Sequence, residues 1–240
     1  MLNLIRGVNF MAYYCALGVG LVVSTVFLFS RSNGASVKNL FLKMISSLFF
    51  ILTAVCAVIL NPQSLTYGAL LIMGGVLGLC GDTALDLKYV YKKDAHAYLV
   101  SGFQFFLVGH IFYSGAVIRY NKLDWKAVLI SAAISIAIAA GSVLLEKLLK
   151  VEYKNYKLIV FLYVCFLTMT TVVSIWSAVL NHEKSMILMA VGAVLFLLSD
   201  LVLSNTYFGK GWDKPVHIFV NHLLYYAGQF LIASSILFLN

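Results

Sequence analysis

The chain has 240 residues, of which 62% are hydrophobic and only 11% are charged. Soluble domains carry about 25% charged and about 45–50% apolar residues, so this composition excludes an ordinary soluble domain. It indicates an all-α polytopic membrane protein. The net charge of +8 does not point to a nucleic-acid partner, because basic residues of membrane proteins collect in cytoplasmic loops.

A membrane-spanning helix needs about 20 mostly apolar residues. In chain order, eight segments meet this requirement: 10–30, 40–60, 65–87, 96–118, 127–148, 157–180, 185–205 and 216–238. The first is too long for the apolar part of a signal peptide and is interpreted as a span. All connections are short, so residues 1–240 are predicted to form a single transmembrane domain. A bacterial chain would lie in the inner membrane and a eukaryotic one in the endoplasmic reticulum.

The basic residues predict the orientation of these spans. Twelve of the 17 fall on one side of the predicted topology, and the other side carries Arg6, Arg119, Lys122, Lys126 and Lys184. The positive-inside rule places the larger group in the cytoplasm and both termini outside.

Two aspartates interrupt the end of the third span. Residues 78–87 read GLCGDTALDL and follow a long uncharged run. Ionisable groups within spans are costly and usually face an interior or a water-filled cavity. Asp82 is therefore a functional candidate, the alternative being an interfacial carboxylate paired with Lys88. Asp86 lies one turn nearer the loop and is interpreted as a solvated or ion-paired helix end.

A third aspartate, Asp200, follows the uncharged residues 186–199 and marks an internal repeat. Residues 73–85 (MGGVLGLCGDTAL) and 191–203 (VGAVLFLLSDLVL) match at six of 13 positions, and Asp82 aligns with Asp200. The spacing predicts two parallel four-helix halves, as in several transporter folds. The two aspartates would then be counterparts that face a shared centre.

Other polar side chains within the spans are candidates for contact with a substrate: Lys43, Gln104, His110, Ser199, Asn221, Tyr225 and Gln229. Each has an alternative interpretation, because polar residues also join helices within membranes and Lys43 can extend toward the interface. Phosphate-binding loops, HExxH pairs and GxSxG motifs are absent from the sequence, and the four cysteines stand apart. We therefore predict neither a metal nor a cofactor.

Four segments together resemble the YhhN-like lysoplasmalogenase family, whose members are integral membrane proteins with eight spans. They are GLCGDTALDL (78–87), FQFFLVGHIFYSGAV (103–117), GAVLFLLSDLVL (192–203) and YYAGQFLIASS (225–235). The second span fits less well, since Lys43 is followed by Met44 where family members often have Lys-Pro.

The resemblance implies a hydrolase that cleaves the vinyl ether bond of lysoplasmalogens into a fatty aldehyde and a glycerophospho-ethanolamine or -choline. Its catalytic aspartates fall on Asp82 and Asp200. Such chemistry needs a proton donor and a negative charge beside a developing oxocarbenium ion, and two carboxylates supply both in glycosidases. The remaining polar candidates would hold water, glycerol oxygens or, for Lys43 and Lys88, the lipid phosphate. Which aspartate is the acid, the head-group preference and the oligomeric state stay open.

Three alternatives use the same aspartates differently. A proton-coupled small-molecule transporter would also place paired carboxylates in its spans, although matching spans broken by Pro or Gly are missing. An intramembrane aspartyl protease would need GxGD, whereas residues 78–82 read GLCGD. In a purely structural or lipid-binding protein, the aspartates would only join helices.

Overall fold

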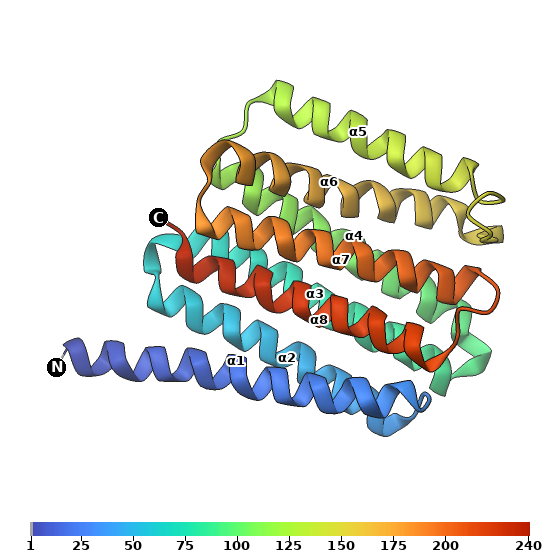
Figure 1. The fold of residues 1–240 in the computed structure, drawn as a ribbon, viewed down its shortest axis with the longest axis horizontal. Coiled ribbons are helices and arrows are strands. Elements are labelled where there is room, and N and C mark those ends of the chain that lie inside the picture. The colour runs from blue at the N-terminus through green and yellow to red at the C-terminus, as the bar shows by residue number, and fades with distance from the viewer. Residues whose placement is uncertain (1) are drawn as a thin grey trace.

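The computed structural model describes residues 2–240, with side chains from residue 7 onward, so the side chain of Arg6 lies outside the described part. The described chain is all-helical, and the predicted fold class is confirmed (Figure 1). Its eight long helices are α1 (Leu2–Ser32), α2 (Val37–Leu60), α3 (Leu65–Val90), α4 (Ala95–Tyr120), α5 (Trp125–Leu144), α6 (Lys157–Asn181), α7 (Lys184–Phe208) and α8 (Pro215–Ser235). Each contains a stretch long and apolar enough to cross a membrane.

Polar residues and proline set several helix starts. The Ser36 side chain accepts a hydrogen bond from the backbone N–H of Asn39 at the start of α2, and Asp124 does the same for Ala127 in α5. These caps satisfy N–H groups that have no partner within the helix. Pro215 begins α8, where its missing N–H is not needed.

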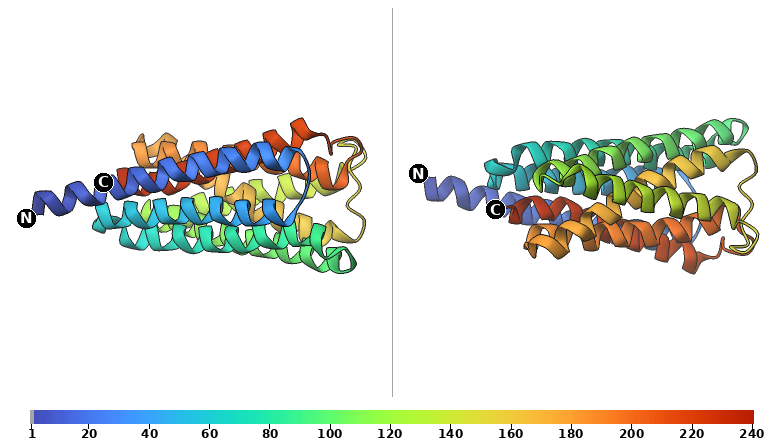
Figure 2. Two further views of the ribbon diagram at one scale, coloured as in Figure 1. Left: turned by 90° about the horizontal axis from the view of Figure 1, so that it is seen from below. Right: turned by 90° about the horizontal axis from the view of Figure 1, so that it is seen from above.

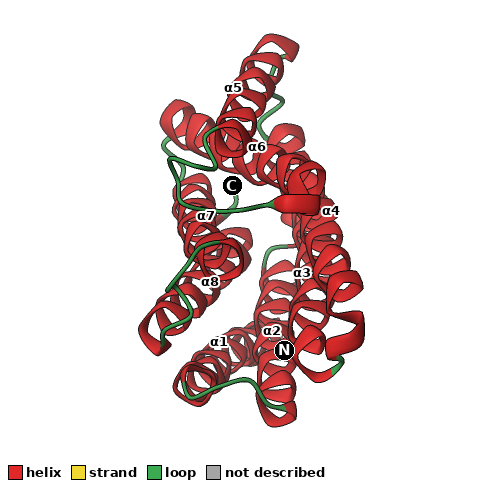
Figure 3. Ribbon diagram, turned by 90° about the vertical axis from the view of Figure 1, so that its right-hand side faces the viewer, coloured by secondary structure: helices red, strands yellow, loops and turns green. Residues whose placement is uncertain are grey.

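Seven of the helices form a closed ring. Neighbouring helices pack in the order α1, α2, α3, α4, α6, α7 and α8, and α8 closes the ring against α1 while also contacting α2. Helix α5 stands outside and packs mainly on α6, as the end-on view shows (Figure 3). All helices run along the long axis of the molecule (Figure 2).

The two halves of the chain share one packing pattern. The contacts α1–α2, α2–α3 and α3–α4 recur as α5–α6, α6–α7 and α7–α8, and α4–α6 is matched by α8–α2. Glycines mark the closest approach in each half. A Cβ added at Gly74 in α3 would lie 3.0 Å from the carbonyl oxygen of Gly109 in α4, and one at Gly192 in α7 would lie 2.8 Å from that of Gly228 in α8. This is the pattern expected for two parallel repeats.

Both termini lie at one end of the bundle, and the loops α1–α2, α3–α4, α5–α6 and α7–α8 lie at the other (Figure 1). Asp82, Asp86 and Asp200 are all in the halves of their helices nearest these loops. The ring therefore brings two segments that are more than a hundred residues apart in sequence to the same depth.

Candidate active site

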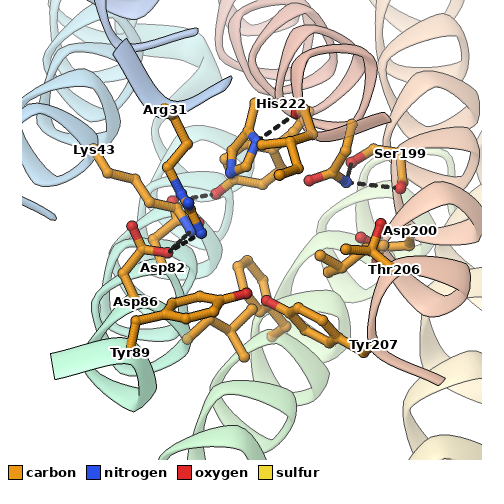
Figure 4. A pocket seen from close by; sticks show the side chains of 16 residues that line it. Arg31, Lys43, Asp82, Asp86, Tyr89, Ser199, Asp200, Thr206, Tyr207 and His222 are labelled. Atoms are coloured by element: carbon orange, nitrogen blue, oxygen red, sulfur yellow. Dashed lines mark hydrogen bonds and ion pairs between the residues drawn. The ribbon is translucent and has the colours of Figure 1, made fainter. Parts of the chain in front are cut away.

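A small polar cavity of about 40 Å³ lies inside the loop-bearing end of the ring. We call it the polar cavity; it is lined by Arg31, Lys43, Asp82, Leu85, Asp86, Tyr89, Phe106, Ser199, Asp200, Leu203, Thr206, Tyr207, Ile218, Asn221, His222 and Tyr225. These residues come from six helices, and α5 and α6 contribute none of them. The volume suits a few water molecules. Figure 4 shows Asp82 and Asp200 on opposite walls.

Asp82 is buried and surrounded by donors from two other helices. Its Oδ1 lies 3.3 Å from Nζ of Lys43 on α2. Its Oδ2 accepts hydrogen bonds from the hydroxyls of Ser47 at 2.6 Å and Tyr225 at 2.7 Å. A buried carboxylate is stable as an ion only with such partners, so this arrangement suits the charged form.

Lys43 does not extend to the interface. Its side chain is buried and its ammonium lies between Asp82 and Asp86, with Nζ 3.5 Å from Oδ1 of Asp86. Arg31 on α1 adds a second cation, 3.9 Å from the same Asp86 oxygen. Asp86 is therefore an ion-paired residue and not a solvated one. The two cations and two carboxylates form a compact buried cluster (Figure 4).

Asp200 has different surroundings. The hydroxyl of Tyr163 on α6 donates a hydrogen bond to its Oδ2. Among the described side chains, no lysine, arginine or histidine forms an ion pair with this carboxyl group. A buried carboxyl without a neighbouring cation suits the neutral, protonated form. The two aspartates that align in the repeat thus differ in their partners.

Tyr225 is held in place by a chain of hydrogen bonds behind the polar cavity. The Tyr113 hydroxyl donates to Oε1 of Gln229 at 2.8 Å, and Nε2 of Gln229 donates to the Tyr225 hydroxyl at 3.4 Å. Tyr225 therefore has its own proton available for Asp82. Gln229 contacts Tyr225 and does not itself line the polar cavity.

Asn221 and Ser199 join α8 to α7 beside Asp200. Nδ2 of Asn221 donates to the carbonyl oxygen of Ser199 at 2.8 Å and to its Oγ at 2.9 Å. Both residues also line the polar cavity. They join the two helices at the wall of the polar cavity.

Two sequence candidates lie away from the polar cavity. Gln104 is exposed on the outer face of α4. His110 is buried deeper in the same helix, where its Nδ1 lies 3.2 Å from Oγ1 of Thr170 and its ring meets Phe196 edge-on. Neither is in a position to touch a molecule in the polar cavity.

Lys88 does not pair with Asp82. Its ammonium lies 3.1 Å from the ring centroid of Tyr207, as a cation–π contact. Lys43 takes the position beside Asp82 because α2 packs directly against α3, whereas Lys88 is six residues further along α3 and reaches toward α7. The alternative interpretation of Asp82, an interfacial carboxylate paired with Lys88, is therefore wrong.

Several residues of the site were not among the sequence candidates: Arg31, Ser47, Tyr89, Tyr163, Thr206, Tyr207 and His222. In the sequence, Arg31 served only to predict the orientation of the spans, as one of the twelve basic residues of the larger group. Two carboxylates four residues apart in an apolar segment, Asp82 and Asp86, were the available signal for the charge cluster. The contact of Tyr163 with Asp200 has no signal in the sequence, since it depends on how α6 packs on α7.

The arrangement combines two ion-paired carboxylates, Asp82 and Asp86, their two cations and one carboxyl group without an ion pair, Asp200, around one small cavity. Among the described residues, no group of three or more His, Cys, Asp or Glu side chains is arranged to hold a metal ion. The site can supply a proton from one wall and negative charge from the other, which is the division of labour found in acid–base hydrolases.

The model of the YhhN family covers residues 38–236 of the chain. Neither the curated proteins nor the solved structures contain a match.

Proposed function

The chain belongs to the YhhN family, and from this membership and the geometry of the polar cavity we propose that it is a membrane-embedded hydrolase of lysoplasmalogens. The proposed reaction breaks the vinyl ether bond with water and releases a fatty aldehyde and a glycerophospho-alcohol. The observation that carries the proposal is the contrast between the two carboxyl groups on opposite walls of one cavity. Asp82 is ion-paired with Lys43, and Asp200 has only the Tyr163 hydroxyl as a partner.

Asp200 is the proposed general acid. Its proton is transferred to the outer alkene carbon, the carbon one bond further from the glycerol oxygen, and an oxocarbenium ion forms. A buried carboxylic acid without a cation beside it retains its proton until it meets a group that can accept this proton, here the alkene carbon. The Tyr163 hydroxyl orients the carboxyl group.

Asp82 is the proposed negative partner. Its charge stabilises the oxocarbenium ion from the opposite wall and orients a water molecule toward the cationic carbon. Water adds to that carbon and passes a proton to the Asp200 carboxylate, which restores the acid. The hemiacetal then collapses, the C–O bond to glycerol breaks, and the glycerol oxygen takes the hydroxyl proton. Tyr225 keeps Asp82 in position throughout.

The head group is proposed to lie beside Arg31. This side chain is buried at the wall of the polar cavity, and its Nε has no hydrogen-bond partner in the described structure. A guanidinium with free N–H groups is well suited to a phosphate. Asp86 holds the guanidinium in place, and Lys43 is occupied by the two carboxylates.

The test uses purified protein in nanodiscs with a lysoplasmalogen and measures the aldehyde released. We expect turnover by the wild-type protein and a loss of about 10²–10⁴-fold in kcat for Asp200→Asn, because the amide has no acidic proton. The kcat of the Asp82→Asn variant should be lowered by a similar factor. Full activity in either variant would contradict the roles of the two carboxyl groups.

Asp213→Asn is the matched control. Asp213 is an exposed carboxylate in the loop after α7, and its removal should leave turnover unchanged. A thermal unfolding midpoint for each variant separates loss of chemistry from loss of folding. Uptake of solutes by proteoliposomes, with no aldehyde released, would favour the transporter alternative.

A further inference from the structure

A second cavity adjoins the polar cavity and is not used by the chemistry above. It encloses about 260 Å³ between α4, α5, α6 and α7 and the loop of residues 145–156. Most of its lining is apolar, and we call it the apolar cavity. Asp200 and Leu203 line both cavities, so these two side chains stand at the junction between them.

The apolar cavity has a closed back and an open side. Its back consists of fully buried residues of α6, among them Val160, Leu167 and Thr168. Its rim carries large apolar side chains that face outward: Ile138 on α5 is 46% exposed and Leu201 on α7 is 55% exposed. Helices α5 and α7 both pack on α6, and Ile138 and Leu201 are exposed on α5 and α7, so the opening lies between these two helices and faces the lipid.

The loop of residues 145–156 closes the end of the apolar cavity that faces water. Val151 forms an isolated backbone bridge with Gly209, and the backbone N–H of Glu152 donates to the carbonyl oxygen of Phe208 at 2.9 Å. This loop is therefore attached to the end of α7. A molecule in the apolar cavity reaches the hydrocarbon of the bilayer more directly than it reaches water.

The size of the apolar cavity matches a hydrocarbon chain. On α7 its lining runs from Leu197 to Phe208, which at about 1.5 Å per residue is about 17 Å. That is roughly half of the ~30 Å hydrocarbon core, the depth filled by the chains of one leaflet. Burial of apolar surface favours an occupant by about 25 cal/mol per Å², so an alkyl chain is a better occupant than water.

We propose that the apolar cavity binds the single hydrocarbon chain of a lysophospholipid, and that the chain enters sideways from the bilayer between α5 and α7. The proposal rests on the proposed function for the identity of the lipid. It places the first carbons of the chain beside Asp200, at the junction of the two cavities. From there the chain fills the apolar cavity, and its distal end reaches the lipid at the open side beside Ile138 and Leu201. The second chain of a diacyl lipid has no place in this arrangement.

The test uses a photoreactive lysophosphatidylcholine whose saturated acyl chain carries a diazirine. This probe has no vinyl ether, so its binding is independent of the proposed hydrolysis. After irradiation in nanodiscs, we expect peptides of α6 and α7 that line the apolar cavity to carry the label. Unlabelled lysophosphatidylcholine should compete, and diacyl phosphatidylcholine should not. Label spread evenly over the lipid-facing surfaces of the eight helices would overturn the proposal.

Two neighbouring substitutions provide the matched comparison. Leu201→Trp fills the rim of the apolar cavity with a larger side chain and should lower labelling about tenfold, which corresponds to about 1.4 kcal/mol of binding free energy. Leu198→Trp adds the same side chain at a position that is 43% exposed and outside the cavity, and it should label like the wild-type protein. Equal labelling of the two variants would count against the proposal. Labelling of the cavity without aldehyde release from lysoplasmalogen would support the chain site and refute the proposed reaction.

Discussion

Lys43 and Asp82 form a buried ion pair between α2 and α3, with Nζ 3.3 Å from Oδ1. Both side chains are almost inaccessible to solvent, and Asp86 shares the same ammonium group. Removing one member of a buried pair leaves a charge without compensation, which is more damaging than removing both.

Lys43→Met is therefore expected to destabilise the protein by about 3–5 kcal/mol, because Asp82 loses its cation and Arg31 pairs only with Asp86. The double variant Lys43→Met/Asp82→Asn should recover part of this loss. The stability of the single and the double variant is measured by thermal unfolding in detergent. Lys38→Met, at an exposed position near the start of α2, is the control and should change stability by less than about 0.5 kcal/mol. Additive effects of the two buried substitutions would contradict the pairing.

Tyr225→Phe is expected to lower kcat about 10–100-fold, because it removes the hydroxyl that donates to Asp82. Hydrogen bonds to charged groups contribute about 1.5–3 kcal/mol. The measurement is aldehyde release at saturating substrate. Tyr67→Phe removes another buried hydroxyl, bonded to Ser235 at the far end of the bundle, and should leave kcat within about twofold. If both variants lose activity equally, the Tyr225 hydroxyl has no particular role at Asp82.

Arg31→Gln tests the proposed position of the phosphate. We expect kcat/KM to fall about tenfold or more for a lysoplasmalogen, and much less for an alkenylglycerol that lacks the phosphate. Any disturbance of Asp86 affects the two substrates alike, so their ratio isolates the contact with the head group. An unchanged ratio would place the phosphate elsewhere.

Gly192→Ala tests the close packing of α7 on α8. The new Cβ would lie 2.8 Å from the carbonyl oxygen of Gly228, so the helices must move apart at a loss of about 1–3 kcal/mol. Gly141→Ala is the matched change within α5, where a Cβ meets nothing within 4 Å. Alanine there should be neutral or stabilise by up to about 1 kcal/mol. Similar unfolding midpoints for both variants would argue against a tight α7–α8 contact.

The number and class of the helices could be predicted from the sequence, because runs of apolar residues long enough to cross a membrane are a strong signal. The rotation of each helix about its own axis, which decides which side chains face the inside of the ring, could not be predicted. Helix α4 buries the polar His110 and exposes the apolar Phe105. Its sequence pattern therefore does not show that Phe103 and Phe106 face inward while Gln104 faces outward. Only packing against α3 and α6 determines this.

The site shows the same limit. Asp82 and Asp200 could be selected because charge is rare within apolar runs. Arg31 lies at a helix end, where basic residues are common whichever way the helix crosses the membrane. Nothing in the neighbouring sequence shows that its side chain turns into the ring. Tyr163 is one of many aromatic residues in apolar segments. Its role depends on a contact with α7, 37 residues further along the chain.

The position of Asp200 at the junction of the two cavities has a consequence for the fate of the products. In the proposed reaction, the bond that breaks lies at the boundary between the polar cavity, which is suited to water, and the apolar cavity, which is suited to hydrocarbon. The aldehyde is formed on the oily side and can return to the bilayer without passing the charged cluster. The phosphorylated alcohol is formed on the opposite side and departs toward water. The two products therefore do not compete for one exit, and each leaves into the phase in which it is most soluble.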